Sequence, residues 1–313
     1  MPNDDGSTRH TDPRVVSAAL AGLRAPRKTL PPWLFYDDEG CRLFYRITAL
    51  PEYYLTRAER APLAQAAAYV AARMPPGSTL VEYGGSDETK ALTLLEQDRR
   101  TFTRYVPIDV AAGALEAVRQ RLGDRLPSLA VHPIAGDFMD EIPLPAGGVR
   151  LGFFPGSTIG NLEPEQAQTF LLRCRLALGP NALFLLGADV RKDPAILVPA
   201  YDDAAGVTAA FNHNLLVRLN REAAANFDLR QFRHRAIWND AESRIEMHLE
   251  SLTAQVVTLA GQPISFMAGE TIHTENSYKH RPEDLIALAN QAGWQLDRMW
   301  TDPDRRFTVY LLE

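Results

Sequence analysis

The sequence contains little cysteine, and none of it in an arrangement that binds metal or builds a disulfide framework. Only Cys41 and Cys174 are present among 313 residues, which fits a reducing cytoplasm. No His, Cys and Asp group has metal-ligand spacing, so we expect no metal. No apolar run is long enough to span a membrane, and the polar start Met1–His10 is not a secretory signal. We therefore expect a cytoplasmic protein without a membrane segment.

The chain also lacks an excess of positive charge. It has 33 Lys and Arg residues against 39 Asp and Glu residues, a net charge of −6 at pH 7. Proteins that act on nucleic acids usually display a basic face, so this balance argues against a nucleic-acid partner. We expect a small-molecule ligand and a monomer, and the length suits one large or two moderate domains.

A third absence concerns the first glycine-rich turn. Leu80-Val-Glu-Tyr-Gly84-Gly85 reads as a buried strand and a tight turn, and Ser86-Asp-Glu88 reads as the start of a helix. Glycine lets a ligand approach the main chain, and the helix start favours a carboxylate or phosphate. The third glycine of Gly-x-Gly-x-x-Gly is missing, which disfavours a dinucleotide oxidoreductase. Many α/β proteins have such a turn without any ligand.

Acidic residues end two further predicted strands at intervals typical of βα units. Asp109 ends the run Tyr105–Asp109, and Asp137 follows the next run. The carboxyl ends of parallel strands meet at the switch point of a doubly wound sheet, so both acids can flank one ligand. Asp109 suits two ribose hydroxyls, while Asp137 can accept from an adenine amino group beside the main chain of Phe138. Each acid alone could be a solvated loop acid or a helix cap, but together the three turns resemble those of class I S-adenosylmethionine (SAM) methyltransferases.

Alternating strands and helices predict a parallel sheet with right-handed crossovers between Thr79 and Asp189. We predict strands at Thr79–Tyr83, Tyr105–Asp109, Ala130–Ala135, Val149–Phe154 and Ala182–Ala188. Helices are predicted at Pro13–Leu23, Ala58–Met74, Glu88–Gln97, Ala111–Leu122 and Pro164–Leu178.

The alternation breaks down after this region. A helical part, Ala204–Asn226, precedes strands at His234–Trp238, Arg244–Ser251, Gln255–Leu259 and Gln262–Phe266. The helix Pro282–Gly293 and an antiparallel hairpin, Trp294–Asp302 with Arg306–Leu312, then return to the sheet. The fold class is therefore α/β, a Rossmann-like class I methyltransferase sheet with an additional α+β substrate-binding domain.

The glycine-rich loop after the fourth strand contains a single amide side chain. It reads Pro155-Gly-Ser-Thr-Ile-Gly-Asn161. In class I methyltransferases this loop faces the sulfonium methyl, and an asparagine there can accept from an amine and donate to a carboxylate. Asn161 also fits a turn residue before the helix at Pro164, and the local sequence leaves both interpretations open.

Four longer motifs complete the pattern. They are Pro31-Pro-Trp-Leu-Phe-Tyr-Asp37, Ile47-Thr-x-Leu-Pro-Glu-Tyr-Tyr-x-Thr-Arg57, Phe154-Pro-Gly-Ser-Thr-Ile-Gly-Asn161 and Ile272-His-Thr-Glu-Asn-Ser-Tyr-Lys279. From about Leu20 to the C-terminus the chain resembles the histidine Nα-methyltransferases, which form hercynine on the ergothioneine route. The resemblance implies three successive methyl transfers from SAM to the α-amine of histidine. Methylation of another amino acid, or a SAM-binding homologue with impaired turnover, are the alternatives.

The resemblance also implies roles for individual residues. The SAM-binding positions are Gly84, Lys90, Asp109, Asp137 and Phe138, with Lys90 near the methionine carboxylate. The catalytic positions are Tyr36, Tyr53 and Asn161. The substrate-binding positions are Tyr53, Gly156, Asn161, Tyr201, Met247, Glu275 and Ser277, of which Glu275 and Ser277 bind the imidazole.

Without the resemblance, ordinary structural roles remain open for several of these residues. Tyr53 and Tyr201 could be half-buried tyrosines, Met247 core filler and Glu275 a surface loop acid. One departure from the family concerns the first turn, where Gly84-Gly-Ser86 replaces Gly-Ser-Gly. It places two acids beside the methionine end of SAM, so we expect the cofactor to bind more weakly.

The domain boundaries follow from these assignments. We expect a disordered tail over 1–12, a segment 13–57 that joins the substrate-binding domain, the SAM-binding domain over 58–192, the substrate-binding insertion over 193–280, and a C-terminal helix and hairpin over 281–313 that complete the methyltransferase sheet.

Overall fold

The computed structural model describes residues 11–313, so the tail expected to be disordered lies outside the described residues except for its last two positions. Asp12, one of these two, caps helix α1 (Pro13–Leu23) by accepting from the backbone N–H of Arg14 at 2.8 Å. The chain divides into two compact units. Unit 1 comprises Met1–Tyr53, Pro194–Asn239 and Ile245–Glu275, and unit 2 comprises Tyr54–Asp193, Asp240–Arg244 and Asn276–Glu313.

Unit 2 is built on an eight-stranded sheet of order β13-β14-β7-β6-β2-β3-β4, with β5 also paired to β3. Six strands are parallel, and β14 and β13 are antiparallel at one edge. The chain enters at the central strand β2 and builds outward on either side of it, which is the doubly wound order. The strands are β2 (Ser78–Tyr83), β3 (Phe102–Asp109), β4 (Ala130–Val131), β5 (Ile134–Ala135), β6 (Arg150–Phe154), β7 (Leu183–Asp189), β13 (Leu296–Thr301) and β14 (Phe307–Leu312).

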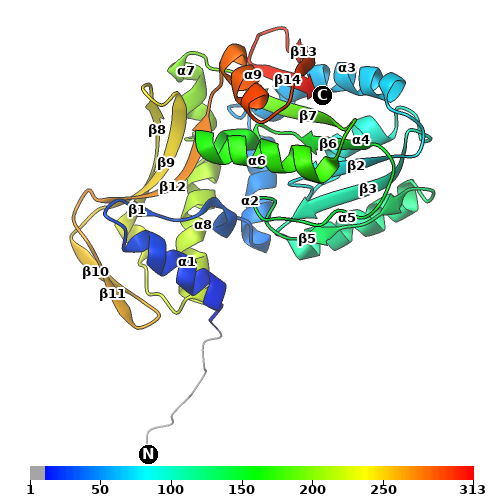
Figure 1. Ribbon diagram of the computed structural model, residues 1–313. Helices are drawn as coiled ribbons and strands as arrows, with labels where there is room; N and C mark the ends of the chain where they lie inside the picture. Colours follow the sequence, from blue (N-terminus) through cyan, green and yellow to red (C-terminus); the bar gives the residue numbers. More distant parts are fainter. Residues whose placement is uncertain (1–10) are drawn as a thin grey trace, which may run out of the picture. The chain divides into compact units, whose positions relative to one another are not determined.

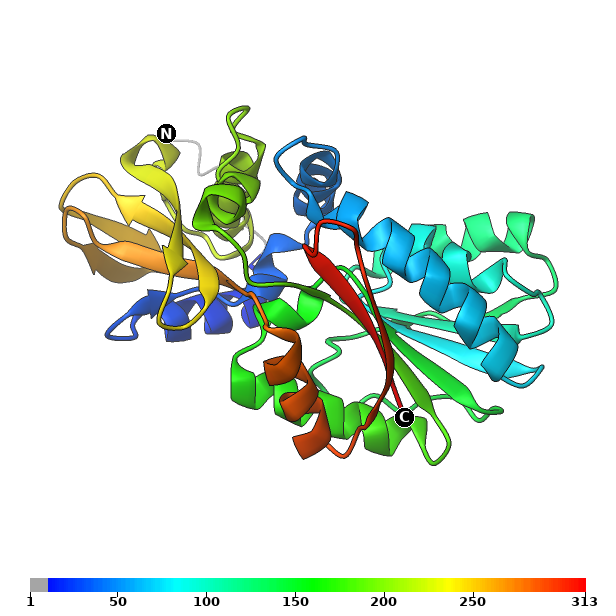
Figure 2. The ribbon, with the colours of Figure 1, turned by 90° about the horizontal axis from the view of Figure 1, so that it is seen from above.

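Helices cover both faces of this sheet, as Figure 2 shows for the long helix α3 on one side and α6 and α9 on the other. Each face has its own apolar core, and most strand residues are fully buried because both faces are covered. The helices of the first face are α3 (Leu55–Arg73), α4 (Thr89–Leu95) and α5 (Ala112–Arg125). Those of the second are α6 (Pro164–Leu178) and α9 (Pro282–Gln291).

Unit 1 combines a four-stranded sheet of order β1-β12-β9-β8, a separate hairpin of β10 and β11, and a group of helices around α8 (Figure 1). Its strands are β1 (Lys28–Thr29), β8 (Phe232–Asn239), β9 (Arg244–Ser251), β10 (Gln255–Leu259), β11 (Gln262–Phe266) and β12 (Thr271–Tyr278). The first residue of β9 and the last three residues of β12 belong to unit 2. Its helices are α1, η1 (Pro32–Phe35), α2 (Asp38–Thr48), α7 (Pro194–Leu197), η3 (Val198–Ala200), α8 (Val207–Glu222) and η4 (Leu229–Gln231).

Most predicted elements are confirmed, and several of them have the predicted bounds, including α1, α6, β9, β10 and β11. The predicted strand Ala130–Ala135 is instead two short strands, because Pro133 has no N–H to give to the ladder. Helix α2 and strands β1 and β12 were not predicted. Within the described residues no helix is both long and apolar enough to cross a bilayer.

Candidate functional site

Two glycines form the turn between β2 and α4, each for a different reason. Gly84 has φ +82°, which glycine adopts without strain. A side chain at Gly85 would place its Cβ 2.7 Å from the Cβ of Pro107, so only glycine fits there. Both backbone N–H groups donate to the carbonyl of Ile108, at 2.8 and 3.0 Å. The turn is therefore held tightly against β3.

The two acids after this turn are both engaged. Asp87 Oδ1 accepts from the N–H of Thr89 at 2.7 Å, and the Glu88 carboxylate receives two hydrogen bonds from Arg121, each 2.6 Å long. Burial opposes ionisation of Glu88, but the Arg121 guanidinium outweighs it and lowers the pKa of Glu88. Arg121 thus offsets much of the negative charge that the Gly84-Gly85-Ser86 departure brings to the predicted methionine end.

Asp109 and Asp137 lie at the same edge of the sheet, as predicted. Asp109 pairs with Ala135 in the β3–β5 register, and its carbonyl accepts from Gly136 at 3.0 Å. Burial raises the pKa of Asp109, although the N–H of Ala111 donates to its carboxylate at 2.9 Å. The ring of Phe138 packs edge-on against Phe154, 5.3 Å between centroids, which fixes the main chain beside Asp137.

Lys90 is held by a buried carboxylate that the sequence reasoning did not identify. Its Nζ lies 2.6 Å from Oε2 of Glu59, a residue of α3 that exposes 2 % of its surface. The other oxygen of Glu59 accepts from the backbone N–H of Gly156 at 2.8 Å. One carboxylate therefore joins the predicted cofactor-binding Lys90 to the predicted substrate-binding loop at Gly156. The sequence does contain a sign of this buried acid, because Glu59 lies four residues from both Leu55 and Leu63, on the apolar side of α3.

The loop that carries Asn161 forms a short 3-10 turn, η2 (Thr158–Asn161), after β6. Its backbone passes so close to β12 that a Cβ at Gly160 would lie 2.8 Å from the carbonyl of Tyr278. Ser157 has φ +63°, and its Oγ accepts from the N–H of Asp189 at 2.9 Å. Glu163, not Asn161, caps the following helix α6 through a capping box. Asn161 thus ends a turn that is fixed from two sides.

A buried charged group lies beside this loop and contacts the predicted Ser277. We call Asp189, Lys192, Lys279 and Tyr54 the Asp189 group. Oδ2 of Asp189 lies 2.9 Å from Nζ of Lys279 and accepts from the hydroxyl of Tyr54 at 2.6 Å, and Oδ1 accepts from Lys192 at 2.5 Å. Burial alone would raise the pKa of Asp189, but the two ammonium groups hold that pKa below its usual value. Lys279 also donates to Oγ of Ser277 at 2.8 Å.

In unit 1, the three predicted tyrosines belong to one aromatic cluster. The rings of Tyr53 and Tyr201 meet at 6.3 Å between centroids, and Tyr36 lies 6.2 Å from the ring of Phe44. Phe44 in turn lies 6.4 Å from Tyr53. Tyr53 and Tyr201 expose only 8 % and 6 % of their surface. Three phenols from distant parts of the sequence are therefore brought together.

Met247 and Glu275 lie on neighbouring strands, β9 and β12. Met247 is buried, and its carbonyl accepts from Oγ1 of Thr274 at 3.0 Å. Glu275 is not in a surface loop, because it lies within β12 and exposes only 9 % of its surface. A carboxylate in such a position requires polar partners, since burial without them is costly.

The family of the chain follows from comparison with known proteins. A family model described as histidine-specific methyltransferase, SAM-dependent, matches residues 15–313. The chain belongs to this family. It is 44% identical over 296 residues to the histidine N-alpha-methyltransferase of Mycolicibacterium smegmatis, covering 93% of this chain and 92% of the relative. A protein of the same description from Mycobacterium tuberculosis is 42% identical over the same shares.

The fold agrees with this assignment. A SAM-dependent methyltransferase structure from Clostridium acetobutylicum matches with a TM-score of 0.50 at 9% identity, covering 87% of this chain and 98% of that one. At this identity the match bears on the fold alone. Together with the sheet order of unit 2, it confirms the predicted class I SAM-dependent methyltransferase fold.

Three side chains of this methyltransferase offer metal-ligand atoms within 4.8 Å of one another among the described residues: Glu246, His248 and His273. Nε2 of His248 lies 3.1 Å from Glu246, and the two imidazole rings stack at 4.8 Å with 23° between their planes. Imidazole lone pairs lie in the ring plane, so nearly parallel rings direct them side by side rather than to one point. We interpret the group as an imidazole–carboxylate pair covered by a second ring.

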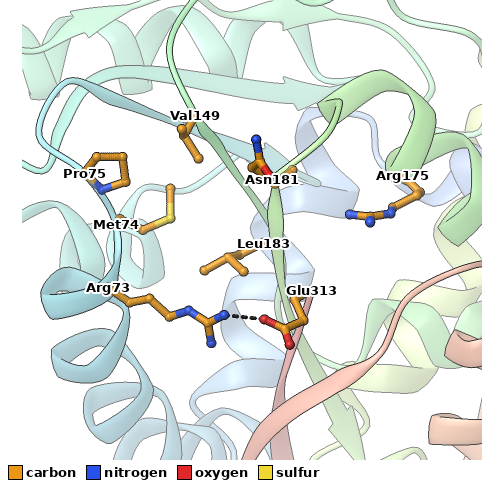
Figure 3. A pocket seen from close by; sticks show the side chains of 9 residues that line it. Arg73, Met74, Pro75, Val149, Arg175, Asn181, Leu183 and Glu313 are labelled. Carbon is orange, nitrogen blue, oxygen red and sulfur yellow. Dashed lines mark hydrogen bonds and ion pairs between the residues drawn. The ribbon is translucent and has the colours of Figure 1, made fainter.

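A cavity of about 390 Å³ lies in unit 2 (Figure 3). It is at the amino ends of β6 and β7, whereas Asp109 is at the carboxyl end of β3 and Asp137 follows that of β5. It is lined by Val149 and Leu183, at the amino ends of β6 and β7, and by the side chains of Arg73, Arg175 and Glu313. Arg73 is paired with Glu313, and Arg175 stacks on Trp294 at 4.8 Å. Ligands of open α/β sheets bind at the carboxyl ends of strands, so this cavity is not the candidate site of the methyltransferase.

Proposed function

We propose that the protein transfers methyl groups from SAM to the α-amine of L-histidine, three times in succession, to form Nα,Nα,Nα-trimethylhistidine (hercynine). The observation that carries the proposal is the match of the histidine-specific family model across residues 15–313. That range includes every residue to which we give a role. SAM is the methyl donor in this proposal, because the family is SAM-dependent.

SAM is assigned to the carboxyl edge of the unit 2 sheet. Gly84 allows the close approach of the methionine part, and the ammonium of Lys90 pairs with its carboxylate. Asp109 accepts from the ribose hydroxyls, while Asp137 and the main chain of Phe138 bind adenine. The pairing of Asp109 with Ala135, two residues before Asp137, supports this assignment.

The residues assigned to histidine are those that the resemblance implies for it. Asn161, Tyr53 and Tyr201 bind its carboxylate and α-amine, and Tyr36 and Gly156 lie by the amine. Glu275 accepts the imidazole N–H, Ser277 binds the other ring nitrogen, and Met247 flanks the ring. The burial of Glu275 supports its role, since an unpaired buried carboxylate would penalise phenylalanine or leucine in place of histidine.

The reaction depends more on the alignment of the amine with the methyl group than on general acid–base catalysis. SAM supplies a methyl group on a positively charged sulfur, which is a good leaving group. The neutral α-amine attacks in line, so that an N–C bond forms as the C–S bond breaks and S-adenosylhomocysteine is released. Asn161 and the tyrosines orient the amine toward the methyl group, which lowers the entropic part of the barrier. The amine loses a proton before each transfer, and Tyr36, Tyr53 or an ordered water relays it.

We propose further that the enzyme works as a cytoplasmic monomer without a metal ion. Alkyl transfer from a sulfonium needs no Lewis acid, and no role in the mechanism above calls for one. Neither Cys41 nor Cys174 forms a disulfide, and burial raises the pKa of the Cys174 thiol far above its usual value, which fits a reducing compartment.

Mass spectrometry of purified protein incubated with SAM and histidine tests the proposal directly. We expect mono-, di- and trimethylhistidine in sequence, with S-adenosylhomocysteine as the coproduct. Calorimetry with S-adenosylhomocysteine and a panel of amino acids then tests selectivity. If another amino acid gives a binding signal and histidine gives none, that amino acid and not histidine is the substrate. Cofactor binding without any methylated product would indicate a SAM-binding homologue with impaired turnover.

A further inference from the structure

Lys279 fixes the direction of a hydrogen bond at the residue proposed to bind the imidazole. Its Nζ donates to Oγ of Ser277 at 2.8 Å, and both side chains are buried, exposing 1 % and 3 % of their surface. An ammonium has three donors and no acceptor, so Ser277 must be the acceptor in this bond. The hydroxyl proton of Ser277 therefore serves a partner other than Lys279.

The second feature of this region is the charge of the groups around Lys279. The Asp189 group contains two ammonium groups, Lys192 and Lys279, against the one carboxylate of Asp189, so the group itself has a net positive charge, and the carboxylate of Asp302 acts on Lys192 from outside it. His280, next along the chain, adds no further charge above pH 5, since burial and Lys279 lower its pKa to about 4. Burial lowers the pKa of Lys192 to about 8, against the opposing charge of Asp189, so Lys192 is charged below pH 7. Tyr54 contributes a neutral hydroxyl.

The other polar and charged side chains near this part of β12 bind each other. Asn276 and Tyr278 both donate to the carboxylate of Glu163, which also pairs with Arg244. Ser277 and Glu275 lie two residues apart on β12, and side chains two apart on a strand point to the same face. One imidazole can therefore meet a carboxylate through one ring nitrogen and the Ser277 hydroxyl through the other.

We propose that Lys279 is a positioning residue that makes Ser277 a hydrogen-bond donor, so that the enzyme binds the neutral imidazole of histidine and rejects the imidazolium. The neutral ring offers one N–H, which Glu275 accepts, and one bare nitrogen, which accepts from Ser277. An imidazolium would present N–H to Ser277 and would bring a second cation within about 5–6 Å of the Lys279 ammonium. The inference rests on the proposed function, because it assumes histidine as the substrate.

Calorimetric binding of histidine to the S-adenosylhomocysteine complex between pH 5 and 7.5 tests it. In the unaltered protein the Kd should rise about tenfold per pH unit below the imidazole pKa of about 6.5. In Lys279→Met the rise should shrink to less than about threefold per unit, because neither the fixed donor nor the like charge remains. Lys279→Arg keeps an N–H donor and a positive charge, so it should keep the steep dependence.

Lys192→Met is the matched control, since it removes the other lysine of Asp189 without touching Ser277. Loss of a buried lysine alone would affect both methionine variants equally. The positioning role predicts a much larger change of the pH profile for Lys279→Met, because only Lys279 contacts Ser277. Equal pH profiles in the unaltered protein and Lys279→Met would overturn the inference, and so would a profile that flattens as much in Lys192→Met as in Lys279→Met.

A second ligand keeps the test valid if Lys279→Met does not fold. The ring of β-(1,2,4-triazol-3-yl)-L-alanine resembles imidazole and stays neutral across this pH range. The unaltered protein should bind it with nearly constant affinity while histidine binding weakens, and the same slope for both ligands would refute the inference. If the unaltered protein binds no histidine at all, the proposed function fails, and this inference fails with it. If the protein forms hercynine but Lys279→Met has the same pH dependence of histidine binding as the unaltered protein, only this inference is refuted and the proposed function stands.

Discussion

At the scale of single residues, Glu275 gives the sharpest test of substrate choice. Its carboxylate is largely buried on β12, and the proposed partner is the imidazole N–H of histidine. We expect Glu275→Gln to weaken histidine binding by about 10- to 100-fold, since a charged hydrogen bond contributes about 1.5–3 kcal/mol. Calorimetry should show affinity for S-adenosylhomocysteine unchanged within about twofold.

Glu283→Gln is a suitable control, because Glu283 is an exposed acid on α9. It should leave both affinities as they are. Equal losses of histidine and cofactor affinity in Glu275→Gln would mean that Glu275 supports the fold and does not contact the substrate.

Asn161 is expected to act on turnover more than on cofactor binding. It ends the η2 turn, which the Ser157–Asp189 hydrogen bond holds in place. Asn161→Ala should lower kcat at least about 100-fold, equivalent to about 3 kcal/mol of transition-state stabilisation. Single-turnover kinetics with saturating SAM measures this, and Asn290→Ala on the exposed side of α9 is the control. A variant that retains most of its activity would remove Asn161 from the mechanism.

Single residues differ in how far the sequence reveals their place. Asp109 and Asp137 could be predicted as neighbours, because parallel strand ends meet at one edge whatever the details of packing. Glu59 could not, because its partners Lys90 and Gly156 come from other elements and only the folded chain brings them together. The same holds for Lys279, whose motif was noticed but whose contact with Ser277 depends on side-chain rotamers.

At the scale of elements, the contact between α3 and α4 separates a structural from a cofactor-binding role of Lys90. Glu59 is buried, so Lys90→Met leaves a carboxylate without its cation. We expect a loss of about 1–3 kcal/mol in unfolding free energy, below the roughly 3–5 kcal/mol for fully buried pairs, because Lys90 is partly exposed. The double variant Lys90→Met/Glu59→Gln should recover most of this stability, since no unpaired charge remains.

The double variant should not recover SAM binding. If Lys90 pairs with the methionine carboxylate, both variants lack that cation and both lose cofactor affinity in calorimetry. Recovery of SAM affinity together with stability would show that Lys90 supports the turn only through Glu59.

Elements were predictable where one physical signal dominated. The amphipathic helix α1 and the hairpin β10–β11 have clear periodicity and turn residues, and their bounds were predicted as observed. Strand β12 has polar residues on both faces, including Glu275, Asn276 and Ser277, so neither alternation nor an apolar run marks it. Its partner β1 consists of two residues some 240 positions earlier in the chain, and such a pairing has no local signal.

At the scale of the whole molecule, the two units are interleaved in sequence, since each is built from three separate segments. Alternation of strands and helices identified the sheet of unit 2 because its strands follow one another closely. The segments of unit 1 lie at both sides of that region, so its sheet combines strands that local patterns cannot pair. The composition of the chain carries no information about which distant segments meet.

The stability of the whole protein should depend on pH through one buried acid of unit 2. Glu82 lies on β2, exposes 1 % of its surface and accepts from the hydroxyl of Tyr105. Burial raises the pKa of Glu82 from 4.5 to about 8, against the opposing effects of the Tyr105 hydrogen bond and of Lys90. The folded protein therefore holds a proton that the unfolded chain releases above pH 4.5. This contribution is fully present below that pH and is lost as the pH rises toward 8.

Between pH 6.5 and 7.5 buried bases act in the opposite direction, so the effect of Glu82 is measured as a difference between two proteins. Burial lowers the pKa of His280 to about 4 and the pKa of Lys192 to about 8, so both groups bind more protons in the unfolded chain. Relative to Glu82→Gln, the unfolding free energy of the unaltered protein should fall by about 1.4 kcal/mol per pH unit in this range. Glu82→Gln has the shape of the protonated acid but no titrating group, so it keeps the contributions of the other groups and lacks only that of Glu82. Urea denaturation at several pH values measures both slopes, and parallel slopes would mean that Glu82 is ionised in the folded protein.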